Sequence, residues 1–278
     1  MQRRLQRPRL AIASPMKIAT WNVNSIRTRQ GLVCDWLRAN PVEVLCVQET
    51  KVIDADFPRD PFESLGYDLA VSGQKSYNGV AILSRLPLEQ VDIGFGALLP
   101  PEQVGDLDEQ KRAIAATVGG VRLINLYVPN GGEYNSDKYD YKLRWLNLLY
   151  DYLQKTLDKN TSLCICGDMN IAPEDRDLHT PPGKTPVVGT TPAEREALQR
   201  CLSLGLADAF RKFNQEDKQY SWWDYRAGAF PRNRGWRIDH HYLTPDLYER
   251  ATACTIDREP RQWTKPSDHT PVIVEWPD

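Results

Sequence analysis

Five short polar stretches border apolar runs in this sequence, and each carries residue types that can bind a metal ion or move a proton. If the apolar runs are strands, their polar ends lie at one edge of a sheet, where residues far apart in the sequence meet and loops commonly carry function. The stretches are 21–24 (WNVN), 48–51 (QETK), 127–131 (YVPNG), 167–170 (GDMN) and 267–269 (SDH). We therefore expect a single site at this edge.

The side chains expected at this edge are oxygen ligands and one imidazole. Oxygen-rich sets without thiolates suit Mg²⁺ or Mn²⁺ rather than zinc, and a divalent ion beside a phosphate stabilises the leaving oxygen. A histidine paired with a carboxylate keeps its proton more readily, and a second carboxylate can orient or deprotonate a water. The set therefore predicts phosphate-ester chemistry. Its members are Asn22, Asn24, Glu49, Asp168, Asn170, Asp239, Asp268 and His269.

Each stretch taken alone has a simpler explanation. An isolated Asp or Asn after a strand is usually part of a turn, Glu49 alone would fit a solvated strand end, and His269 alone would fit a loop. Short patterns match by chance often enough that one of them would carry little weight. Their joint appearance favours an active site over five unrelated turns.

Strand-like and helix-like segments alternate along the whole chain, without an internal repeat or a flexible linker. Nearly continuous apolar runs such as 42–48 are typical of strands buried on both faces, and Thr191, Pro192 and Glu194 form a helix-start signal with a capping box. We expect one domain over 16–278, with sheets in the middle and helices outside. The expected strands are 18–23, 42–48, 79–84, 121–128, 162–166, 238–244 and 271–276, and the expected helices surround 32–37, 143–157 and 191–205.

The composition is that of an ordinary globular protein. The 278 residues are 41% hydrophobic, and the net charge of −2 means that any DNA binding must depend on a local basic face. Cys46, Cys164 and Cys166 lie in apolar runs and have no zinc-like spacing, which indicates buried thiols in a reducing compartment. No run is long enough to span a membrane. We expect a cytoplasmic protein.

The first fifteen residues differ from the rest. They carry four arginines and no acid, and Met16 follows them. We interpret them as a disordered basic arm or an over-extended start. Targeting to an organelle by this arm is the alternative, although no clear apolar segment supports it.

The motifs WNVNSIR, QETK, NGVAILS, NLYVPNG, GDMN, SWWDYR, RGWRID and SDHTPV, in this order from about Met16 to the C-terminus, resemble the exonuclease III / abasic-site endonuclease family. Single motifs such as GDMN are shared with the wider endonuclease/exonuclease/phosphatase superfamily, whereas SWWDYR with RGWRID is more specific to DNA repair. The resemblance implies an α+β fold, a four-layered αββα sandwich. It also implies Mg²⁺-dependent hydrolysis (Mn²⁺ as a substitute) 5′ to abasic sites, with 3′→5′ exonuclease and 3′-end-cleaning activity. The enzyme would be a monomer of bacterial type that binds double-stranded DNA and lies near the nucleoid through this substrate.

The resemblance also implies roles for individual residues. Glu49 would be the principal metal ligand, supported by Asn22 and Asp268. Asp168 would prepare the attacking water, and a second metal ion, if there is one, would be bound by Asp168, Asn170 and His269. The remaining roles are the amide of Asn170 on the scissile phosphate, Tyr127 beside that phosphate, and Asp239 with His269 as a carboxylate–imidazole pair.

The segment 221–241 is rich in aromatic and arginine side chains. Arginine binds phosphate oxygens, and aromatic side chains fill the space of a missing base. By resemblance, Trp222, Trp236 and Ile238 would line the pocket for the base-less sugar, while Trp223 and Tyr225 are as well explained by the core. The predicted phosphate contacts are Arg232, Arg234 and Arg237, and by resemblance Arg112 would lie on the side that faces the DNA.

Two other functions remain open. A phosphatase or phosphodiesterase of the same superfamily, acting on lipid or inositol phosphates, would keep Glu49, Asp168 and His269 without needing the arginine- and tryptophan-rich segment. A catalytically silent DNA-binding module would be expected to have lost one of these side chains, and all are present. Asn24 replaces an acid of the animal branch, and an arginine of that branch is missing near Glu133. The balance among the three nuclease activities therefore stays open.

Overall fold

A computed structural model describes residues 15–157, 161–183 and 185–277. The predicted basic arm, apart from Pro15, lies outside the described residues. In the described part of the chain, the helices are too short or too polar to cross a bilayer.

The first of two six-stranded sheets has the order β11-β12-β1-β2-β4-β3. β1 and β2 are parallel and pair Asn22 with Gln48, so Glu49 follows directly beside the end of β1. The parallel pairing explains why two of the polar stretches meet. The strands are β1 (Met16–Asn22), β2 (Val44–Gln48), β3 (Asp68–Ser72), β4 (Val80–Ser84), β11 (Ala253–Ile256) and β12 (Val272–Trp276).

The second sheet has the order β5-β6-β7-β8-β10-β9. β7 and β8 are parallel and pair Tyr127 with Asp168, while β10 runs antiparallel and pairs Asp239 with Asp168. Three predicted site residues therefore lie side by side on adjacent strands. The strands are β5 (Glu89–Ile93), β6 (Ala113–Val118), β7 (Val121–Tyr127), β8 (Leu163–Asp168), β9 (Ala207–Asp208) and β10 (Asp239–Leu243).

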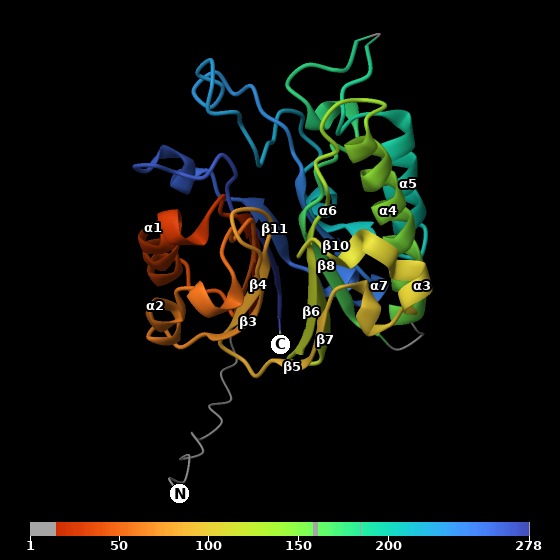
Figure 1. Ribbon diagram of the computed structural model, residues 1–278. Helices are drawn as coiled ribbons and strands as arrows, with labels where there is room; N and C mark the ends of the chain where they lie inside the picture. Colours follow the sequence, from red (N-terminus) through yellow and green to blue (C-terminus); the bar gives the residue numbers. More distant parts are fainter. Residues whose placement is uncertain (1–14, 158–160, 184, 278) are drawn as a thin grey trace, which may run out of the picture.

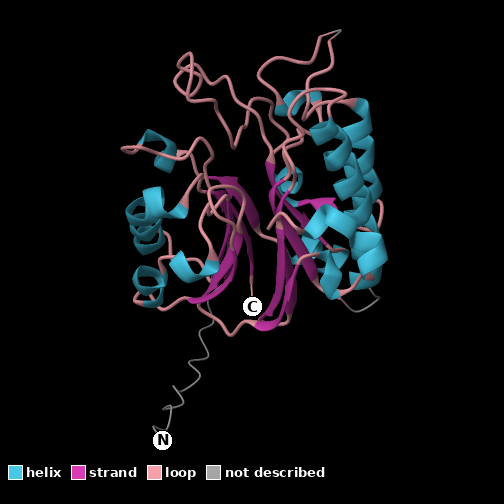
Figure 2. Ribbon diagram, in the orientation of Figure 1, coloured by secondary structure: helices cyan, strands magenta, loops and turns pink. Residues whose placement is uncertain are grey.

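The two sheets pack face to face, and helices cover their outer faces (Figure 1). Helices lie on both outer sides and strands in the middle (Figure 2), which confirms the four-layered αββα sandwich. The helices are α1 (Ile26–Ala39), α2 (Arg59–Glu63), α3 (Pro101–Val104), α4 (Asp137–Thr156), α5 (Pro192–Leu202), α6 (Ala209–Phe213) and α7 (Pro245–Arg250), with 3₁₀ turns at Asp54–Asp56, Phe95–Ala97, Gly105–Asp108, Asp175–Asp177 and Glu259–Gln262.

Three apolar cores hold the layers together. The central core lies between the sheets and includes Ile18, Val44 and Leu123 together with the buried thiols of Cys46, Cys164 and Cys166, as predicted. The other two cores lie under α1 and α2 on one side and under α4 and α5 on the other. Burying apolar surface on both faces of each sheet is worth roughly 25 cal/mol per Å². It fixes the strand ends relative to one another.

Helix α5 begins as the sequence predicts. The Thr191 hydroxyl accepts a hydrogen bond from the Glu194 amide, the Glu194 carboxylate accepts one from the Thr191 amide, and Pro192 occupies the first turn. The helix ends at Leu202, before the glycine expected to stop it.

Candidate active site

The predicted site residues meet at one edge of the sandwich, where strands of both sheets end. The sequence predicted the edge of one sheet, but Asn22 and Glu49 come from the first sheet while Tyr127, Asp168 and Asp239 come from the second. The loops before β10 and β12 lie above this edge (Figure 1). Here a cavity of about 240 Å³ is lined by Glu49, Tyr127, Asn130, Asp168, Asn170, Val188, Trp222, Trp236, Ile238, Asp268 and His269.

His269 and Asp239 form the predicted carboxylate–imidazole pair. The His269 Nδ1 lies 2.9 Å from Asp239 Oδ2, and the Ser221 hydroxyl donates to the same carboxylate oxygen at 2.6 Å. Burial alone would lower the pKa of His269, but Asp239 and Asp168 raise this pKa to about 10. The imidazole is therefore a proton carrier that is charged at neutral pH, with its Nε2 directed toward the cavity.

Asp168 is fully buried and lies opposite that imidazole. Its Oδ2 is 3.7 Å from His269 Nε2, and its Oδ1 accepts the backbone amide of Asn170 at 2.9 Å. Burial raises the pKa of Asp168, the charge of His269 opposes the rise, and the resulting pKa is about 7. A carboxylate that titrates near neutral pH is suited to accept a proton from water.

Glu49 is held by three donors. The Tyr127 hydroxyl and the Asn22 amide both donate to Glu49 Oε1 at 2.9 Å, and Lys51 Nζ lies 2.7 Å from Oε2. Burial would raise the pKa of Glu49, but Lys51 and Asn22 lower it overall. For Tyr127, burial and the nearby charge of Glu49 raise the pKa well above its ordinary value, so the phenol is a neutral donor.

Asn22 connects the two acids. Its side-chain nitrogen donates to both Glu49 Oε1 and Asp168 Oδ2 at 2.9 Å, and its oxygen accepts the backbone amide of Asn24 at 3.0 Å. The oxygen needed to bind a metal therefore points away from the carboxylates. Asn22 therefore bridges the two acids, and its part in metal binding stays a prediction.

Asp268 is fixed at the opposite side of the cavity. Trp222 Nε1 donates to Asp268 Oδ2 at 3.0 Å, and the side-chain amide of Asn24 donates to Oδ1 at 3.0 Å. Burial would raise the pKa of Asp268, but His269, Trp222 and Asn24 lower it overall, so the group is ionised at neutral pH. Asn24 also accepts from Lys51 Nζ at 2.6 Å and so links Asp268 to Glu49.

Asn170 follows β8 with a left-handed backbone, at φ 49°. Its amide donates to the Val128 carbonyl at 2.9 Å, and its oxygen accepts from Asn130 at 3.1 Å. Asn130 thus lines the cavity and holds a predicted site residue, although the sequence analysis named it only within its motif. The Pro-Asn-Gly turn after an apolar strand was the available signal.

The side chains around the cavity fit a divalent cation. The available ligands are carboxylate, amide and imidazole groups, which suit Mg²⁺ or Mn²⁺. Asp168, Asp239 and His269 place one ligand atom each within 4.8 Å of one another. Asp239 and the His269 Nδ1 are committed to each other, however. Glu49 Oε2 already contacts the ammonium of Lys51, so the Glu49 side of the cavity attracts positive charge.

An aromatic wall borders these acids. The rings of Trp222 and Trp236 meet edge to face, 5.7 Å apart, and pack with the buried side chains of Ile238, Leu178 and Ala172. As predicted, Trp222, Trp236 and Ile238 line the same cavity as His269. The wall is apolar where its rings pack on Ile238, and Trp222 also donates a hydrogen bond to Asp268.

The four predicted DNA-contacting arginines differ in exposure. Arg232 and Arg234 are exposed. The Arg112 guanidinium lies 4.6 Å over the Tyr127 ring and donates to the Tyr127 carbonyl, so it supports the tyrosine. The prediction for Arg237 is wrong: its side chain is 1% exposed and forms ion pairs with Asp177 and Asp208.

Trp223 and Tyr225, which could both have been core residues, differ in burial. Trp223 is fully buried in a small aromatic cluster, whereas Tyr225 is 50% exposed and is therefore not a core residue. Its hydroxyl donates to the Pro266 carbonyl at 2.9 Å, close to the loop that carries Asp268.

Comparison with known proteins agrees with this geometry. Residues 19–269 match the family model of the Endonuclease/Exonuclease/phosphatase family, and the chain belongs to this family. It is 34% identical to exodeoxyribonuclease III of Haemophilus influenzae over 94% of this chain and 100% of that protein.

Two solved structures also match. An AP endonuclease from Archaeoglobus fulgidus is 43% identical, with a TM-score of 0.88 over 94% of this chain and 99% of that one. The 3′ phosphatase NExo from Neisseria, bound to a product DNA hairpin, is 39% identical, with a TM-score of 0.89 over 94% of this chain and 99% of that one.

Proposed function

We propose that this protein is a Mg²⁺-dependent DNA repair nuclease of the exonuclease III type. It hydrolyses phosphodiester bonds 5′ to abasic sites, removes nucleotides from 3′ ends, and cleans blocked 3′ ends. The observation that carries this proposal is the shared cavity, in which the Trp222–Trp236 wall lies beside Asp168 and His269. A phosphate bound in this cavity beside His269 would have its sugar against the wall.

The residues divide the chemistry between the two sides of the phosphate. Asp168, with its pKa near 7, accepts a proton from the attacking water, and the His269 imidazolium donates a proton to, or stabilises, a phosphoryl oxygen. Asp239 keeps the imidazole charged and oriented, while Asn170 and Tyr127 hold the phosphate. Glu49 and Asp268, both ionised, would bind Mg²⁺ (or Mn²⁺), which offsets phosphate charge and stabilises the leaving oxygen.

Two observations argue against the rival functions. The aromatic wall and the exposed arginines Arg232 and Arg234 have no purpose for a small soluble phosphoester. A silent binding module has no need of a buried Asp168–His269–Asp239 group. Purified protein should therefore cut a duplex containing an abasic site, lose this activity in EDTA, and leave inositol phosphates intact. Preferential hydrolysis of the inositol phosphates would contradict the proposal.

Affinity and discrimination should be separable in the segment 221–238. Trp236→Ala opens the wall, so we expect a reduced preference for abasic over intact duplex, with Trp236→Phe in between. Removing Arg232 and Arg234 should weaken binding to all duplexes and flatten the dependence of log K on log salt by about 0.9 per lost phosphate contact. Arg38, an exposed arginine near the far end of α1, provides the control variant Arg38→Ala.

Cleavage and binding of both duplexes at several salt concentrations test this assignment. If Trp236→Ala lowers both substrates equally, the wall does not select the sugar. If the arginine variants keep the wild-type salt slope, these arginines do not contact phosphates.

A further inference from the structure

A fully buried ion pair lies directly behind the cavity. Lys142, in α4, and Glu194, in α5, each have side chains that are 0% exposed, with Nζ 2.6 Å from Oε1. Burial would lower the pKa of Lys142, and the charge of Glu194 opposes this. Apolar side chains of similar volume often stabilise a protein as well as such a pair does, so stability alone is a weak explanation for it.

Lys142 holds two loops that carry cavity-lining amides. Its ammonium donates to the backbone carbonyl of Asn170 at 2.8 Å and to that of Asn130 at 3.3 Å. With Glu194, these carbonyls use all three donors of the ammonium. The side chains of Asn130 and Asn170 are hydrogen-bonded to each other on the cavity side. The loops after β7 and β8 are therefore linked twice, by the Asn130–Asn170 hydrogen bond on the cavity side and by Lys142 on the side of α4.

Glu194 holds a third loop. Both of its oxygens accept the Gly189 amide, at 2.8 and 2.9 Å, and Oε2 also accepts the amide and the hydroxyl of Thr191. Gly189 has a φ of +90°, and a Cβ there would lie 2.9 Å from the Trp236 ring and 3.1 Å from the Asn170 carbonyl. This loop is thus in close contact with both Trp236 of the aromatic wall and the backbone of Asn170.

The three loops also touch one another through Gly131. A Cβ at this residue would lie 2.9 Å from Val188, which lines the cavity, and 3.0 Å from the Lys142 side chain. Little space is left for one loop to move without the others. The loops are 128–131, 169–172 and 187–191.

We propose that Lys142 and Glu194 are positioning residues that lock these three loops together and so set the place of the Asn170 amide relative to the Trp236 wall. The inference rests on the proposed function, since it concerns how the phosphate and the sugar of one substrate are aligned. Neither side chain reaches the cavity, so the pair acts through Asn170, Asn130 and Gly189.

Lys142→Met keeps the length of the side chain and removes its charge. We expect kcat on abasic duplex to fall by about 10²-fold, because misplacing a reacting group by about 1 Å costs this much. KM should change less than kcat, since Trp222, Arg232 and Arg234 lie outside the three loops, and the Mg²⁺ requirement should change little, since Glu49 is untouched. Lys142→Arg, which restores the charge and the donors, should recover part of kcat.

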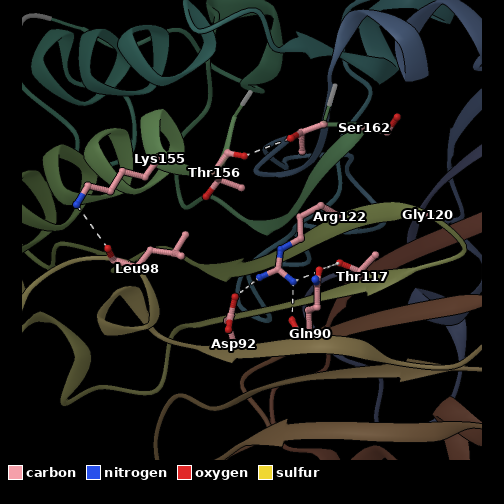
Figure 3. Close-up of a pocket in the computed structure, with 10 residues that line it drawn as sticks. Gln90, Asp92, Leu98, Thr117, Gly120, Arg122, Lys155, Thr156 and Ser162 are labelled. Atoms are coloured by element: carbon pink, nitrogen blue, oxygen red, sulfur yellow. Dashed lines mark hydrogen bonds and ion pairs between the residues drawn. The ribbon is translucent and has the colours of Figure 1, made fainter. Parts of the chain in front are cut away.

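A control variant exists at the other end of the same sheet. Arg122 lies on β7 far from Tyr127, pairs with Asp92, and donates to the Gln90 carbonyl at 2.6 Å (Figure 3). Arg122→Met also removes a partly buried ion pair but leaves all three loops untouched. It should lose thermal stability while keeping kcat.

Hydrogen exchange gives a readout independent of activity. In Lys142→Met, amide exchange should rise in peptides covering 128–131, 169–172 and 187–191 and stay unchanged in β6. If Lys142→Met does not fold because the charge of Glu194 is left buried without a positive partner, the double variant with Glu194→Gln removes both charges and takes its place.

The outcomes separate the two proposals. Wild-type kcat in the Lys142 variant, or a loss equal to that of Arg122→Met, would overturn the positioning role. So would exchange that rises uniformly over the whole sheet. Wild-type protein that fails to cut DNA would contradict the proposed function, whereas the exchange measurement would still test the locking of the loops.

Discussion

His269→Ala and Asp168→Asn should each lower kcat on abasic duplex by about 10²–10⁴-fold, the range typical of removing a positioned proton-transfer group. The reason is geometric. The two side chains face each other across 3.7 Å, and each has a fixed orientation set by Asp239 on one side and the Asn170 amide on the other. Asp239→Asn should also lower kcat, because it removes the charge that keeps the imidazole protonated.

Single-turnover cleavage at saturating Mg²⁺ measures this loss without product release. Thermal melting should show a folded protein in each case, and the His269 variant should still bind abasic DNA, since the Trp222–Trp236 wall is intact. Near-normal turnover in either variant with metal bound would mean that proton transfer is assigned to the wrong side chains.

The central strands could be predicted because burial dominates their sequence. β2, β4 and β8 are buried along their whole length, so apolar runs mark them clearly. β5 is largely exposed at the edge of its sheet, and β6 is rich in alanine. Such strands owe their conformation to pairing with a neighbour more than to their own pattern, so the sequence analysis did not predict them.

The location of the site could be predicted better than the role of each side chain. Glu49, Asp168 and Asp239 follow from their places at strand ends. The Asn22 side-chain oxygen accepts the backbone N–H of Asn24, so its nitrogen faces the two acids. No sequence pattern shows this orientation. Arg237 looked like a phosphate contact because its partners are distant in sequence.

The partners of Arg237 are Asp177 and Asp208, which converge on it only in the folded chain. Lys142 shows the same limit. A lysine is usually solvated, and only the packing of α5 and of two loops around Lys142 gives the buried charge its partners. The pairing of buried charges that are distant in sequence could therefore not be predicted from the sequence.

Glu49→Gln should raise the Mg²⁺ concentration needed for half-maximal activity by at least the 10–100-fold that the loss of a supporting residue around a metal site costs. Glutamine keeps the shape of the side chain and an acceptor for Tyr127 and Asn22, so the fold should survive. It removes the negative charge that now attracts the Lys51 ammonium and that a divalent ion needs.

Activity measured against Mg²⁺ concentration, together with direct Mg²⁺ titration by calorimetry, separates metal affinity from turnover. Glu43→Gln is the matched control, because Glu43 lies near the start of β2, at the opposite end from Glu49, and accepts the Lys17 amide at 2.8 Å. This variant should keep the wild-type Mg²⁺ curve. If Glu49→Gln also keeps it, the metal is bound elsewhere, and Asp168 with His269 become the first residues to test. If wild-type protein cuts DNA fully in EDTA, the acids serve only to orient Lys51, Tyr127 and His269, and the hydrolysis needs no metal ion.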